Sequence, residues 1–82
     1  SETTVAEVSA GDEPTIVDLL VASGLAESKG AARRAIKEGG AYANNQRIQD
    51  AEWKPAESDL LHGSWLVLRK GKKNFGGAKF SK

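Results

Sequence analysis

Two groups of basic side chains are the residues of this sequence best suited to chemistry. The first group has the spacing of one side of a helix and consists of Lys29, Arg33, Arg34 and Lys37. The second lies within five consecutive residues around a glycine and consists of Arg69, Lys70, Lys72 and Lys73. Both side-chain types bind phosphates by charge, and arginine can donate two parallel hydrogen bonds to one phosphate. The pattern therefore indicates a polyanionic partner, although each group by itself is also compatible with a solvated surface.

Other kinds of chemistry find little support. The sequence holds no cysteine and a single histidine, His62, in a polar stretch that is more typical of a surface residue than of a general base. Its glycines do not form the Gly-x-x-x-x-Gly-Lys-Ser/Thr loop that holds nucleotide phosphates. A cluster of metal ligands is also missing from the sequence. We therefore expect no catalytic residue, metal, cofactor or small-molecule substrate in this domain.

The distribution of charge divides the chain. Its 82 residues suit one small domain, and 39% hydrophobic residues allow a modest core. Residues 1–13 contain four acidic residues and no basic one. Residues 14–82 contain twelve basic and seven acidic residues, which gives them a net charge of +5. We interpret residues 1–13 as a flexible acidic linker or tail, and residues 14–82 as a basic domain that binds RNA or DNA.

The sequence gives no sign of a membrane or an export signal. No apolar run approaches the roughly 20 residues that span a bilayer. The N-terminal residues lack the charged and then apolar pattern of a signal peptide. We therefore expect no membrane association and a cytoplasmic location.

Two short helices must position the first basic group. Thr15 and Asp18 have the spacing of an approximate capping box for a helix over residues 16–23, which Gly24 ends. Ser28 can cap a second helix that ends at the glycine pair of residues 39–40. The apolar side of this second helix would consist of Ala31, Ala32, Ala35 and Ile36.

The pattern changes to that of strands after the second helix. We expect a short hairpin with strands at residues 41–43 and 47–49 and a turn that contains two asparagines. An irregular connection should follow over residues 50–63, with Leu60 and Leu61 turned inward. Residues 64–69 form the clearest strand, with Trp65 expected in the core. A last strand over residues 73–80 is weakened by the glycine pair 76–77. Phe75 could stack on a base, but we expect it to pack under the hairpin.

Two stretches resemble a known family. Residues 20–48, LVASGLAESKGAARRAIKEGGAYANNQRI, resemble the RNA-binding domain first known from ribosomal small-subunit protein S-four. Residues 60–75, LLHGSWLVLRKGKKNF, resemble the C-terminal domain of bacterial tyrosyl-tRNA synthetases. The resemblance covers about residues 15–75. It implies an α+β fold in which a two-helix hairpin precedes a small, mostly antiparallel sheet.

The resemblance also implies a function. In such synthetases this domain follows a catalytic domain that activates tyrosine with ATP, and it binds tyrosine tRNA on the side of the anticodon stem and the long variable arm. The catalytic motifs are missing here, so the chain would be only the tRNA-binding part of a tyrosine–tRNA ligase. Both basic groups match RNA-facing positions of the family. Asn45, where the family often has glycine, and residues 76–78, where it has an apolar strand, depart from the pattern.

Two alternatives remain open from the sequence. One is a stand-alone ribosome-associated RNA-binding protein of the same fold, and the other is a protein–protein docking module built on the helical pair. The oligomeric state also stays open, because the part through which a synthetase would form a homodimer lies outside this chain.

Overall fold

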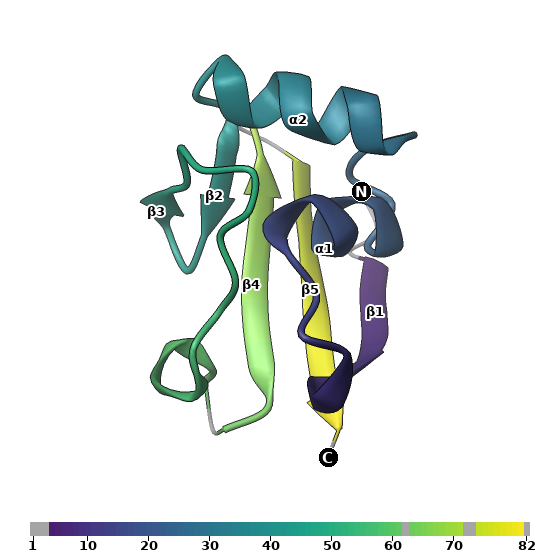
Figure 1. Cartoon of the computed structure of the whole chain (residues 1–82), viewed down its shortest axis with the longest axis vertical. Coiled ribbons are helices and arrows are strands. Elements are labelled where there is room, and N and C mark those ends of the chain that lie inside the picture. The colour runs from purple at the N-terminus through teal and green to yellow at the C-terminus, as the bar shows by residue number, and fades with distance from the viewer. Residues whose placement is uncertain (1–3, 62, 72–73, 82) are drawn as a thin grey trace.

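The computed structural model describes residues 4–61, 63–71 and 74–81. Five strands form one sheet in the order β1-β5-β4-β2-β3 (Figure 1). Their bounds are Thr4–Ser9 for β1, Ala41–Ala43 for β2, Gln46–Arg47 for β3, Trp65–Lys70 for β4 and Asn74–Ser81 for β5. The helices are α1, Ile16–Ala22, and α2, Lys29–Lys37, and two short 3-10 turns span Ala10–Asp12 and Glu57–Asp59. The predicted α+β fold is confirmed, with a sheet that is antiparallel except for the pairing of β1 with β5.

Both helices begin and end where local chemistry predicts. The Thr15 hydroxyl accepts a hydrogen bond from the Asp18 N–H, and the Thr15 N–H donates to the Asp18 carboxylate at 3.1 Å, which completes the capping box. The Ser28 hydroxyl accepts from the Ala31 N–H at 3.1 Å at the start of α2. Gly24 and Gly39, with φ of 79° and 78°, follow the two helices in the left-handed conformation that glycine adopts without strain.

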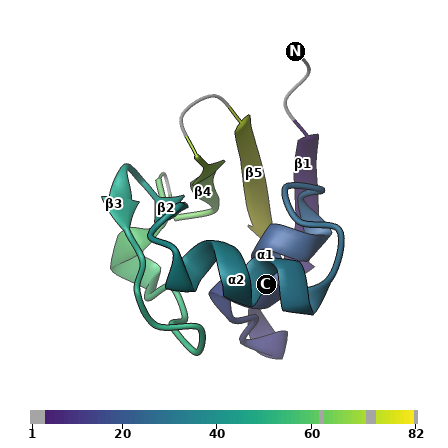
Figure 2. The same ribbon diagram turned by 90° about the horizontal axis from the view of Figure 1, so that it is seen from above.

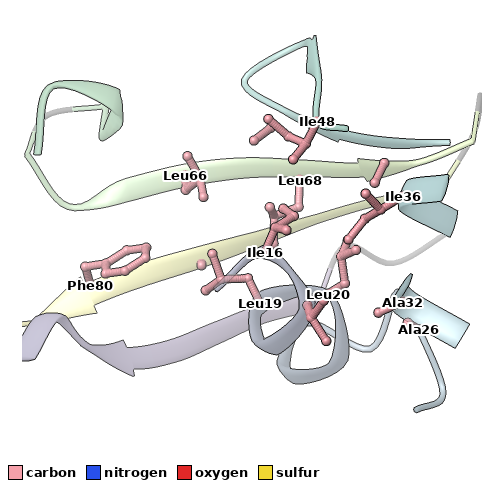
Figure 3. Packing of buried hydrophobic residues seen from close by; sticks show 14 residues of the cluster. Ile16, Leu19, Leu20, Ala26, Ala32, Ile36, Ile48, Leu66, Leu68 and Phe80 are labelled. Carbon is pink, nitrogen blue, oxygen red and sulfur yellow. The ribbon is translucent and has the colours of Figure 1, made fainter. Parts of the chain in front are cut away.

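The core lies between the helices and one face of the sheet. Figure 2 shows α1 and α2 on the same side of the five strands. Figure 3 shows apolar side chains of α1 meeting those of the central strands, and the largest fully buried apolar ones are Ile16, Leu19, Leu20, Leu66 and Leu68. The connection after β3 joins this layer, because the Ile16 N–H donates to the carbonyl of Trp53 at 2.8 Å. No described helix covers the opposite face of the sheet.

The interpretation of residues 1–13 as an unstructured linker is wrong for Thr4–Ser9. These residues form β1, which pairs in parallel with β5 from Thr4 opposite Gly76 to Ser9 opposite Ser81. Ala6 is buried, and Val8 packs against the core. The strand gains its hydrogen bonds from a partner about 70 residues later in the chain, and local sequence carries no sign of that partner.

The predicted last strand is present one residue further along, and it lies inside the sheet despite its glycine pair. β5 lies between β1 and β4, and both glycines are buried within it. A Cβ atom on Gly76 would lie 3.2 Å from two atoms of Leu25 and 3.3 Å from the Ser23 Cβ. Glycine at this position therefore lets the segment that joins the helices approach the strand closely.

Three apolar side chains that were expected to be buried are exposed. Leu61, Trp65 and Phe75 are 47%, 39% and 48% exposed. Along β4, Leu66 and Leu68 face the helices, so that alternation turns Trp65 to the uncovered face. Phe75 lies opposite Arg69 on that same face rather than under the hairpin. Leu60, by contrast, packs against the core as predicted.

Candidate nucleic-acid interface

Helix α2 separates small apolar side chains from basic ones. Ala32, Ala35 and Ile36 are buried against the rest of the domain. The four predicted cations of this helix are all exposed, and they are Lys29, Arg33, Arg34 and Lys37. The predicted two-sided helix is confirmed, because its 3.6-residue period places the alanines and the cations on opposite sides.

The cations of α2 fall on two flanks with different surroundings. Lys29 and Arg33 line a hollow of about 250 Å³ together with Asp18 and Glu52, so that two bases face two acids. Lys29 also lies 3.8 Å from the Asp18 carboxylate, an exposed ion pair of small energetic value. Phosphates would meet little net positive charge on this flank.

The other flank carries a net positive charge and includes a residue of the sheet. Arg34 and Lys70 line a hollow of about 580 Å³ that runs along α2 from Ser28 to Glu38. The Gly71 N–H donates to the Gly40 carbonyl at 2.7 Å, which ties the end of β4 to the end of α2. Two bases face one acid, Glu38, on this flank. We call Arg34 and Lys70 the α2 basic surface, and the exposed Lys37 lies one helical turn after Arg34.

The two described members of the second predicted group, Arg69 and Lys70, point to opposite faces of the sheet. Lys70 lies opposite the buried Ala41 and turns to the helix side, whereas Arg69 lies opposite Tyr42 and turns to the uncovered face. The Arg69 guanidinium stacks 3.9 Å from the centre of the Tyr42 ring. Consecutive residues of a strand point to opposite faces, so basic residues that are adjacent in the sequence do not share one surface. Lys72, Lys73 and His62 lie outside the described residues.

Sequence reasoning singled out Arg69 and Phe75 but missed the side chains that accompany them on the uncovered face. Tyr42 lies in one cross-strand row with Arg69 and Phe75, and Lys79 lies 5.7 Å from the centre of the Trp65 ring in another. The alternation within residues 41–43 and 64–69 could have placed Tyr42 and Trp65 on one face. Only the pairing of the strands shows which face the helices leave open.

The described residues contain neither a candidate metal site nor a helix that could span a membrane. No three histidine, cysteine or acidic side chains there come together in a way that could hold a metal ion. Within the same residues, no helix has both the length and the apolar character that crossing a bilayer requires.

Comparison with known proteins identifies the family. Residues 2–76 match the model of the tyrosine–tRNA ligase SYY-like C-terminal domain. The chain belongs to this family of C-terminal domains. The resemblance seen in residues 20–48 and 60–75 is thereby confirmed for the synthetase family. The match also includes the residues of β1, in agreement with their place in the sheet.

Several tyrosine–tRNA ligases are closely similar over almost the whole chain. The tyrosine–tRNA ligase of Corynebacterium glutamicum is 70% identical over 79 residues, which are 96% of this chain and 19% of the ligase. That of Corynebacterium diphtheriae is 65% identical over 99% of this chain. That of Mycobacterium leprae is 63% identical over 93% of this chain and 18% of the ligase. The chain thus spans about a fifth of the length of these relatives, and it corresponds to their C-terminal domain.

Proposed function

We propose that this domain binds tRNA by holding its phosphate backbone against the α2 basic surface. The observation that carries the proposal is the hydrogen bond between Gly71 and Gly40, which fixes Lys70 beside Arg34 on the flank of α2 with net positive charge. The names of the relatives support tRNA as the polyanion and tyrosine tRNA as its identity. The domain would act in the cytoplasm during tyrosine–tRNA ligation, and the activation of tyrosine with ATP would belong to the remainder of a longer enzyme.

Charge and shape, rather than base identity, would dominate this contact. The surface offers lysine and arginine side chains and the exposed start of a helix, all of which favour phosphate oxygens. Double-helical RNA presents its backbone and its wide minor groove to proteins, so a stem is the natural ligand. We place the contact at the anticodon stem and the long variable arm, as the resemblance implies. Lys72 and Lys73 remain predicted contributors from the sequence.

A charge-reversal experiment tests this proposal. Tyrosine tRNA is titrated with the chain and with the variants Arg34→Glu and Lys70→Glu at two salt concentrations. Removing one cation that neutralises a phosphate should reduce the slope of log K against log[salt] by about 0.7 to 0.9, and each variant should bind more weakly. Lys54→Glu is the matched control, since Lys54 is exposed in the connection after β3 and does not line the hollow.

The outcomes separate tRNA binding from the rival functions. Loss of binding in both variants with an unchanged control supports the α2 basic surface. Equal loss in all three variants would mean that total charge, not this surface, holds the RNA. Binding that ignores salt contradicts a phosphate-based contact. Stronger binding to ribosomal RNA than to tRNA would favour the ribosome-associated alternative, and docking to a protein that survives Arg33→Glu and Arg34→Glu would favour the docking module.

A further inference from the structure

The face of the sheet opposite the helices collects the exposed apolar side chains of the described residues. Val5, Trp65, Val67 and Phe75 stand on that face through the strand register, and Leu61 joins it through its bridge to Trp65. Both helices lie on the other side, as Figure 2 shows. Contiguous exposed apolar surface on a small domain marks a binding site more often than an accident of composition.

Aromatic and cationic side chains alternate along one row of this face. The register places Phe75 on β5 opposite Arg69 on β4, and Arg69 opposite Tyr42 on β2. The Arg69 guanidinium stacks on the Tyr42 ring at 3.9 Å from its centre, and its Nε is buried without a hydrogen-bond partner among the described residues. Stacking therefore holds Arg69 in a fixed orientation, with Phe75 beside it and nearly half exposed.

A hollow of about 350 Å³ adjoins this row. Its lining, drawn from β4, β5, the β2–β3 turn and the connection before β4, consists of Asn44, Asn45, Leu61, Val67, Arg69 and Phe75. Asn44 is held in place, since its backbone N–H donates to the Val67 carbonyl at 2.8 Å and its side-chain oxygen accepts from the Val67 N–H at 3.1 Å. Its amide nitrogen donates to the carbonyl of Asp59. One wall of the hollow is thus rigid, and the exposed Asn45 stands beside it.

The chemistry of this hollow fits a nucleotide better than an apolar protein surface. A nucleobase can stack on the Phe75 ring and on the guanidinium plane of Arg69, as bases do on aromatic residues and arginine in RNA-binding sheets. The Asn45 amide offers both a donor and an acceptor to a base edge. Two cations of this face, Arg69 and Lys79, outnumber its one acid, Glu7, in the described strands. The charge therefore favours a phosphate-bearing ligand.

We propose that the uncovered face of the sheet binds one unpaired nucleotide of RNA, with its base stacked on Phe75 and its phosphate beside Arg69. This inference rests on the proposed function only in taking RNA as the ligand. Arg69 and Lys70 are consecutive and turn to opposite faces, so an RNA that passes the end of β4 contacts both surfaces. The stem would lie on the α2 basic surface, and a nucleotide displaced from stacking would enter the hollow.

The test uses two ligands that separate the two faces. The chain is titrated with single-stranded RNA hexamers and, separately, with a 12-base-pair RNA duplex. Phe75→Ala should weaken hexamer binding by about 5- to 150-fold, the range for loss of one stacked base, and should leave duplex binding within about twofold. Arg34→Glu should weaken binding of the duplex more than that of the hexamers. Trp65→Ala is the matched control, because Trp65 is an exposed aromatic of the same face outside the hollow.

A second variant separates stacking from simple apolar contact. Phe75→Leu keeps an apolar side chain but removes the aromatic ring, so it should lose hexamer affinity almost as Phe75→Ala does. Thermal melting of each variant checks the fold, which should persist because Phe75 is exposed. Full affinity in Phe75→Leu, or equal losses in Phe75→Ala and Trp65→Ala, would overturn the stacking site.

Failure of this inference is distinguishable from failure of the proposed function. If tRNA binds through Arg34 and Lys70 but hexamers do not bind, the nucleotide site is wrong and the α2 basic surface stands. If neither RNA binds, both proposals are wrong. If sedimentation shows a dimer that Val67→Glu dissociates, a second copy occupies the open face and the nucleotide site is likewise excluded.

Discussion

Substituting Gly76 by alanine should destabilise the domain, although alanine has the higher strand propensity. The added Cβ would lie 3.2 Å from Leu25 Cδ1 and Cγ and 3.3 Å from Ser23 Cβ, closer than ordinary van der Waals contact. The end of Leu25 can rotate away, but Ser23 is only 1% exposed and its Cβ moves only with the backbone. The segment between α1 and α2 must therefore shift away from β5 by a few tenths of an ångström.

The magnitude follows from two opposing terms. Overpacking a well-packed site costs about 1 to 3 kcal/mol, whereas replacing glycine by alanine restricts the unfolded chain and returns about 0.4 to 1 kcal/mol. The net loss in the free energy of unfolding is about 1 kcal/mol. For a domain of this size, that loss lowers the melting temperature by about 4 to 8 °C.

The neighbouring glycine supplies the control. A Cβ on Gly77 would lie 3.6 Å from the Leu66 carbonyl oxygen and 3.8 Å from Val5 Cγ2, both ordinary contacts. Gly77→Ala should therefore melt at the same temperature as the parent chain or slightly above it. Thermal melting followed by circular dichroism compares the two variants. A Gly76→Ala variant that melts at or above the parent temperature would refute the close approach of the helical segment to β5.

Two further predictions concern the ends of the sheet. Deleting residues 1–9 should lower the free energy of unfolding by about 2 kcal/mol, because the deletion uncovers the edge of β5 and removes buried Ala6 and partly buried Val8. Chemical denaturation measures this loss. An unchanged denaturation midpoint would support the interpretation of these residues as a linker. Asn45→Gly should raise the melting temperature by a few degrees, because Asn45 holds φ at 70°, where glycine carries no Cβ penalty. The same variant should bind RNA hexamers at least twofold more weakly, since the amide beside the hollow is removed, and a parallel gain in affinity would contradict the role given to Asn45.

Residue types and their spacing were enough to predict the local structure of this protein. Thr15, Asp18 and Ser28 cap the helices through hydrogen bonds that span three residues, so short-range patterns place both helix starts. Gly24 and Gly39 end the helices for a similarly local reason. The two-sided character of α2 follows from the helical period alone. The family resemblance was available from the same stretches, since they carry its motifs.

Contacts between distant segments determine which surfaces those elements form. β1 exists because β5 offers it a hydrogen-bonding edge, and the two are separated by most of the chain. Arg69 and Lys70 are adjacent in the sequence, yet the register of β4 with β2 places Arg69 on the open face and Lys70 on the side of α2. Trp65 and Phe75 are exposed because both helices pack on the other face of the sheet. Helix caps and periods act over a few residues, whereas strand pairing and the choice of the covered face depend on the tertiary structure, which no local pattern specifies.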